Sequence, residues 1–233
     1  MAKKKIFVLA LAVCLLAILS MGSLAWFHAQ DSVKNEFYIA DSKEHSGNEL
    51  FSVDVYEYTE KSPTNKVPTG DTFDEILPGD HLKKEPHVAN TGFYDQYVRV
   101  TVTISDATAW LNAVGEAFKI EDVFEGFDPN KWNHIEKKIE GKDKTDTITY
   151  VLYYTDILDG SDTANDAVSG TTDDITLFTY VNIPQSLTQD QAAAFKGGFN
   201  IDVQAEAVQT ENVVPTGTAA EDAAWAAFKT VAG

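Results

Sequence analysis

The sequence predicts an all-β fold: a jelly roll or β-sandwich of antiparallel strands, with short helical insertions and a C-terminal helix. Several segments rich in β-branched and aromatic residues alternate apolar with polar positions, which is the period of a half-buried strand. Turn-forming Gly, Pro and Asn residues separate these segments, and the stretches with helical periodicity are short. Many strands joined by turns, with few helices, are typical of sandwiches and jelly rolls.

The first expected strand covers residues 50–58, and the Pro- and Gly-containing residues 61–71 form a loop after it. A turn at Leu77-Pro78-Gly79-Asp80 leads into the next strand. The later strands are expected over residues 81–89, 97–104, 132–139, 146–154, 175–183 and 199–208. Short helices are expected over residues 107–118 and 188–195, and a C-terminal helix is expected over residues 219–231.

The N-terminal residues have the pattern of a secretory signal peptide. Lysines at positions 3–5 precede an apolar run over residues 6–19, and small residues follow at Ser23 and Ala25. Signal peptidase is therefore an expected partner, and it should cut between Ala25 and Trp26. The apolar run is shorter than the ~20 residues that a membrane-spanning helix needs. We expect a secreted protein, in the extracellular matrix or at the cell surface, with no membrane contact after cleavage.

The charge of the mature chain excludes some partners. The formal net charge is −18, and it becomes −21 when residues 1–25, with their three lysines and no acid, are removed. Such an acidic chain does not attract nucleic acid or an anionic membrane by its own field. The single cysteine, Cys14, lies in the signal peptide, so no disulfide is expected in the mature chain. No cofactor is indicated.

These features divide the chain into four parts. Residues 1–25 are the signal peptide and residues 26–44 are an N-terminal extended segment. Residues 45–210 form the jelly-roll domain, and residues 211–233 are a C-terminal helical extension.

Three blocks of the chain resemble the TasA/camelysin family. The run from Gly22 to Phe27, followed by Asn35-Glu36-Phe37, resembles the leader of substrates of the SipW-type signal peptidase. Leu77-Pro78-Gly79-Asp80, followed by Val88-Ala89-Asn90-Thr91-Gly92 and Tyr97-Val98-Arg99-Val100, resembles a recurring block of the family, and residues 201–209 with the Ala/Trp-rich C-terminus resemble its end. The resemblance implies a jelly-roll domain and a secreted subunit of biofilm matrix fibres; some family members are labelled metallopeptidases.

The mature N-terminus is a candidate subunit-binding strand. Its apolar residues are Trp26, Phe27, Val33, Phe37 and Ile39. Such a segment can add to the open sheet edge of a neighbouring subunit through main-chain hydrogen bonds, and a head-to-tail contact that does not close gives an open filament. The partner would then be the chain itself, with other matrix proteins as further candidates. Two competing interpretations remain: the segment is a strand of its own sheet, or it is a disordered tail.

Two other functions are alternatives to a fibre subunit. A camelysin-like cell-surface metallopeptidase needs a metal site, for which His81 and His87 are weak candidates, but a His-Glu-x-x-His motif is absent. A monomeric calcium-dependent adhesion or binding module would use acidic residues such as Asp159, Asp162 and Asp166. The alternative for the two histidines is a solvated edge strand without a metal, and the alternative for the aspartates is an acidic surface loop without calcium. No nucleophile with its base is apparent, so we expect no catalytic residues and no enzyme.

Overall fold

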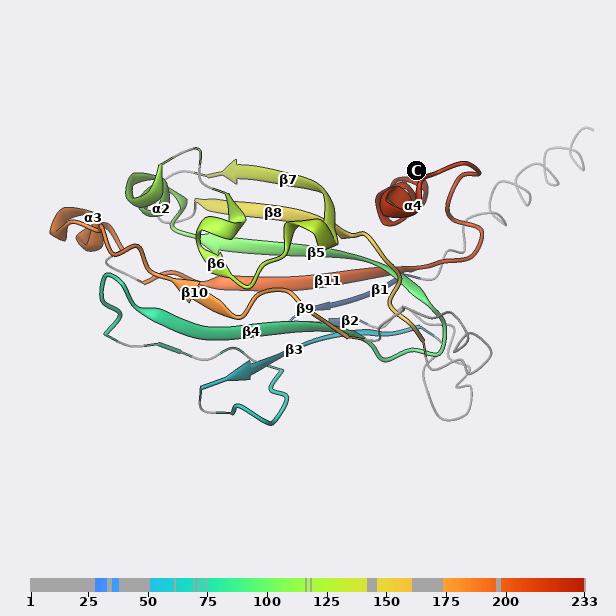
Figure 1. Cartoon of the computed structure of the whole chain (residues 1–233), viewed down its shortest axis with the longest axis horizontal. Helices are drawn as coiled ribbons and strands as arrows, with labels where there is room; N and C mark the ends of the chain where they lie inside the picture. Colours follow the sequence, from blue (N-terminus) through green and yellow to red (C-terminus); the bar gives the residue numbers. More distant parts are fainter. Residues whose placement is uncertain are drawn as a thin grey trace, which may run out of the picture.

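The computed structural model describes residues 28–32, 35–37, 51–60, 62–68, 70, 72–73, 75–115, 117, 119–141, 146–160, 174–195 and 198–232. For residues 28–32 and 35–37 it describes the backbone and its pairing. The described strands form two antiparallel sheets that pack face to face (Figure 1). The expected fold class, an all-β sandwich with short helices and a C-terminal helix, is confirmed.

The larger sheet has six described strands in the order β2-β1-β11-β5-β8-β7. They are β1 (His28–Ser32), β2 (Asn35–Phe37), β5 (Gln96–Ser105), β7 (Trp132–Glu140), β8 (Thr147–Tyr154) and β11 (Ile201–Gln209). In the described residues, β2 and β7 are the two outer strands of this sheet.

The smaller sheet has five described strands, ordered β3-β4-β10-β6, with β9 also paired to β4. They are β3 (Val53–Thr59), β4 (His81–Asn90), β6 (Phe124–Glu125), β9 (Asp174–Thr176) and β10 (Tyr180–Asn182). In the view of Figure 1, β3 and β4 of this sheet lie below β11, β5, β8 and β7 of the larger one, whereas β6 overlaps β5.

The helices are short and lie at the ends and on the outside of the sandwich. The α-helices are α2 (Ala107–Val114), α3 (Gln189–Ala194) and α4 (Ala223–Ala232), and the 3-10 helices are η1 (Ile120–Asp122), η2 (Pro129–Lys131) and η4 (Ala220–Asp222). α3 begins at Thr188, which forms a capping box with Gln191. None of the described helices has the length and apolar character needed to cross a membrane.

The core lies between the two sheets and follows the predicted alternation. Along β5, the side chains of Val98, Val100, Val102 and Ile104 are fully buried, while the residues between them are partly exposed. Residues from the facing sheet, such as Val88, belong to the same apolar cluster. A sandwich core of this kind fixes the register of each strand, because a one-residue slip would expose the whole apolar set.

The single strand expected over residues 175–183 is wrong: it is divided into β9 and β10. Both strands pair with β4 in one continuous register, Thr176 with His87 and Tyr180 with Lys83. The interruption lies opposite Pro86, whose carbonyl accepts a hydrogen bond from the Leu177 N–H. Proline has no N–H to return that bond, so the ladder is broken at this position.

The Asn90-Thr91-Gly92 turn is held by a buried polar network. The Asn90 side chain donates to the carbonyls of Tyr94 and Leu158, and its oxygen accepts from Gly92 N–H and from Gln96 Nε2. A Cβ atom on Gly92 would lie 2.7 Å from the Ser52 backbone nitrogen, so only glycine fits there. This network joins β4 to β5, and therefore one sheet to the other.

Helix α4 covers the outer face of the larger sheet. Phe228 packs with Tyr153 and Val208 in a second apolar cluster. The Arg99 guanidinium pairs with Glu206 across the β5–β11 ladder and lies 4.6 Å from the Phe228 ring. This cation–π contact joins the helix to one end of the outer face of the sheet, where Figure 1 shows α4.

Candidate functional site

The candidate site is the edge of the larger sheet that β1 covers. β1 pairs antiparallel with β11, from His28 opposite Val208 to Ser32 opposite Gln204. On its other side β1 pairs with the three-residue strand β2. Figure 1 shows β1 beside β11, which crosses the whole molecule. β1 is thus joined to the sandwich by its pairing with β11 and by contacts with β3 of the facing sheet, and its removal would expose the edge of β11.

β11 is longer than the strand that covers it. It pairs with β5 along its whole length, but its pairing with β1 ends at Gln204. Ile201–Val203 therefore extend beyond β1 in the described part of the chain. Because Ser105 N–H donates to the Asn200 carbonyl, even-numbered residues of β11 hydrogen-bond with β5, and the main-chain groups of odd-numbered residues face the β1 side.

The candidate subunit-binding residues fall mainly outside the described residues. This holds for Trp26, Phe27, Val33 and Ile39, and for the expected cleavage site between Ala25 and Trp26. Phe37 is the last residue of β2, where its backbone pairs with Gln30. In the single chain, part of the segment thus pairs with the chain's own sheet, as the competing interpretation of an intramolecular strand describes.

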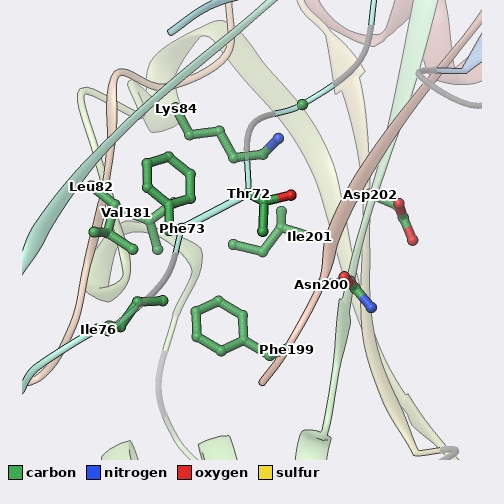
Figure 2. Close-up of a pocket in the computed structure, with 11 residues that line it drawn as sticks. Thr72, Phe73, Ile76, Leu82, Lys84, Val181, Phe199, Asn200, Ile201 and Asp202 are labelled. Atoms are coloured by element: carbon green, nitrogen blue, oxygen red, sulfur yellow. The ribbon is translucent and has the colours of Figure 1, made fainter. Parts of the chain in front are cut away.

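A cavity of about 300 Å³ lies at the end of β11 that β1 does not cover. Its apolar wall comes from both sheets and from the connection that precedes β4: Phe73, Ile76, Leu82, Val181, Phe199 and Ile201. Figure 2 shows Phe199 and Ile201 directed towards Phe73 and Ile76, whereas Asn200 and Asp202 point to the other side of the strand. An adjoining cavity of about 470 Å³ shares Phe73 and Phe199.

A buried ion pair borders the first cavity. The Lys84 ammonium forms a hydrogen-bonded ion pair with the Glu57 carboxylate, and the Glu57 side chain is only 1% exposed. A Cβ atom on Gly70 would lie 3.4 Å from both charged groups, so this residue leaves little room beside the pair. A buried charge of this kind is tolerated only when it is paired.

The structure separates the two histidines that the sequence offered as weak metal candidates. His81 lies at the start of β4, where its ring stacks on Tyr180 and its Nε2 lies 2.7 Å from Glu125 Oε2. This contact holds the pKa of Glu125 below its usual value. His87 lies six residues further along β4, in a different cluster.

His87 ties β9 to β4. Its Nδ1 lies 2.7 Å from Asp174 Oδ1 and its Nε2 lies 3.3 Å from Glu85 Oε1, while its ring stacks on Tyr56. Burial lowers the pKa of His87, but the hydrogen bonds and charges of Asp174 and Glu85 outweigh it, so that the pKa is raised. The two carboxylates lie at opposite edges of the ring, so the three groups do not converge on one point.

The described residues contain no group of three or more His, Cys, Asp or Glu side chains placed to hold a metal ion. Of the candidate calcium ligands, Asp159 is partly buried at the end of a described stretch. Asp162 and Asp166 lie outside the described residues.

The residues that line the cavity carry no sequence pattern that marks a site. Phe199 and Ile201 were expected only as strand residues, and Phe73 and Ile76 belong to a connection without a periodic pattern. The alternation of Phe199 and Ile201 with polar neighbours was the one available signal, and it indicates an apolar face without saying what covers that face.

Comparison with models of known protein families, with curated proteins and with solved structures found no match to this chain.

Proposed function

We propose that the chain is a secreted structural protein, a subunit of extracellular or biofilm matrix fibres that assemble by N-terminal donor-strand exchange. The observation that supports this most directly is the position of β1. It is a short strand between the outer strand β2 and β11, at one side of a sandwich whose core is built from the strands after residue 51. In a fibre, the same strand of a neighbouring subunit takes its place beside β11.

Exchange of this kind costs little free energy once subunits meet. The donor forms the same hydrogen bonds with β11 in the register from Val208 to Gln204, whether it comes from the same chain or from a neighbour. Each subunit then gives one strand and receives one, in a head-to-tail contact. Because that contact does not close on itself, it extends into an open filament.

The charge of the mature chain sets the conditions for assembly. A formal net charge of −21 after signal-peptide removal makes subunits repel one another, and this repulsion keeps them apart at low ionic strength. Salt shortens the screening length to about 8 Å at 0.15 M. Filament growth is therefore faster at higher salt.

Signal-peptide cleavage determines when the donor segment becomes available for assembly. The signal peptide precedes Trp26 directly, so the donor segment becomes free only after export and cleavage. Trp26, Phe27, Val33, Phe37 and Ile39 supply the apolar contacts that accompany the main-chain ladder. Each buried large side chain contributes roughly 1.5–3 kcal/mol.

Electron microscopy of the mature chain tests the proposal. The chain that starts at Trp26 is expected to form filaments, and the variant that lacks residues 26–40 is expected to stay a folded monomer. Asp31→Pro is the matched point variant, because it removes the N–H that faces Ala205 of β11 and leaves the rest of the segment intact. A truncated chain that polymerises at the full-length rate, or that fails to fold, rejects donor-strand exchange.

A further inference from the structure

We infer that the cavity at the end of β11 is the receptor site for residues 33–37 of a second copy of this chain, with Phe37 as the anchor. This inference rests on the proposed strand exchange. It adds that the donor in a fibre is longer than β1 and passes beyond the point where β1 stops in the single chain.

The register of β1 defines where a longer donor would run. His28 lies opposite Val208 and Ser32 lies opposite Gln204, so each step forward in the donor is one step back in β11. A straight continuation places residue 33 opposite Val203, residue 35 opposite Ile201 and residue 37 opposite Phe199. These positions are the overhang of β11 and the residue at the wall of the cavity.

The faces of the strand agree with this placement. Residues directly opposite each other in an antiparallel pair point to the same side of the sheet. Val203 is buried in the core, and Figure 2 shows Ile201 and Phe199 directed into the cavity. In the extended donor, Val33 and Phe37 therefore face the interior, whereas Glu36 and Tyr38 lie on the opposite side.

The cavity has the chemistry of an aromatic anchor site. Phe73, Ile76 and Phe199 line it, and a second cavity that shares Phe73 and Phe199 extends it towards Trp110. The lining also includes the polar residues Thr72, Lys84, Asn200 and Asp202, so the space of about 300 Å³ has an apolar wall only on the side of Phe73, Ile76 and Phe199, beside the end of β11 that no described strand covers on the β1 side. A side chain packed against that wall would gain contacts of the kind that close-packed interiors have. The odd-numbered N–H and C=O groups of β11 face the donor side and can continue the ladder.

The single chain keeps this segment away from the cavity. β2 runs back along β1, so that Glu36 pairs with Asp31 and Phe37 with Gln30. At ~3.4 Å per residue and ~4.8 Å per strand, Glu36 is then about 17 Å along the sheet and about 10 Å across it from Asn200. Residues 36 and 200 become neighbours only if the β1–β2 pair opens into one straight strand.

Disulfide trapping in filaments distinguishes the two arrangements. The mature chain has no cysteine, so each introduced thiol is unique. Full-length mature Glu36→Cys is mixed with size-tagged Asn200→Cys, polymerised and oxidised, and the mixed dimer is measured on a non-reducing gel. Ser32→Cys with Gln204→Cys reports strand exchange alone, since these residues are partners in the observed register. Glu36→Cys with Gln204→Cys is the out-of-register control.

We expect mixed dimers from the 32/204 and 36/200 pairs, and none above background from the 36/204 pair. Trapping of 32/204 without 36/200 overturns the extended donor and leaves strand exchange standing. Failure of both pairs in filaments, or the absence of filaments, rejects the proposed function and this inference together.

Alanine substitutions at two adjacent aromatic residues provide a second readout, in filaments without introduced cysteines. Phe37→Ala is expected to raise the subunit concentration needed for growth at least roughly tenfold, the equivalent of about 1.4 kcal/mol. Tyr38→Ala, on the opposite side of the extended donor, is the matched control and should leave that concentration within about twofold. Equal effects of the two substitutions contradict Phe37 as the anchor.

Discussion

The buried pair of Glu57 and Lys84 makes a quantitative prediction about the sandwich beside the cavity. Lys84→Met keeps most of the side-chain volume but removes the charge that compensates Glu57. The Glu57 side chain is 1% exposed and that of Lys84 is 10% exposed, so the remaining carboxylate would be left in the interior without its partner. Breaking a buried ion pair in this way costs about 3–5 kcal/mol.

Removal of the other charge of the pair should cost less stability. Glu57→Leu leaves Lys84, whose ammonium borders the cavity and can turn towards it, so we expect a loss of about 1–3 kcal/mol. The double variant replaces both charges by apolar groups and should lie within about 1 kcal/mol of the parent chain. The two single losses therefore do not add.

Urea unfolding followed by tryptophan fluorescence at neutral pH measures these differences. Lys83→Met is the control, because Lys83 pairs with Glu85 where their side chains are 24% and 22% exposed, and such pairs contribute at most about 1 kcal/mol. If Lys84→Met and Lys83→Met lower the free energy of unfolding equally, the Glu57–Lys84 pair is not buried in solution and the reasoning fails.

Three further changes test other parts of the structure. The raised pKa of His87 contributes stability that is present below about pH 6.5 and is lost as pH rises through the folded-state pKa, so His87→Gln should flatten the fall in melting temperature between pH 6 and 8; an unchanged slope contradicts this. Gly92→Ala should cost about 1–3 kcal/mol by chemical denaturation, because its Cβ would meet the Ser52 backbone, and a loss within the ~0.5 kcal/mol typical of a neutral surface substitution refutes the close approach. Phe228→Ala should cost about 3–5 kcal/mol by removing the anchor of α4, and a loss below about 1 kcal/mol shows that α4 does not pack as described.

Local sequence patterns were sufficient to predict most strands and the face of each that forms the core. The alternation in residues 97–104 identified β5 and its buried valines, because one face of a sandwich strand must be apolar. The short helix expected over residues 188–195 is α3, and its capping box of Thr188 and Gln191 is also local in the sequence. The break between β9 and β10 was missed because its cause, Pro86, lies on a different strand.

The candidate site depends on contacts between distant parts of the chain. Nothing local in residues 28–32 indicates that they pair with Gln204–Val208, although the extended character of the segment was predicted. The cavity brings together the connection at Phe73, the start of β4 and the start of β11, and no single segment carries its pattern. The sequence named His81 and His87 as weak candidate metal ligands, but it does not show that their partners are different.

The most direct test of strand exchange is complementation in trans. A synthetic peptide of residues 26–40 is titrated by calorimetry into the mature chain that lacks those residues, after circular dichroism has shown that the truncated chain is folded. The account predicts a saturable complex of one peptide per chain, weakened by Asp31→Pro in the peptide. A folded truncated chain that binds no peptide contradicts strand exchange, as does a truncated chain that cannot fold without its own β1.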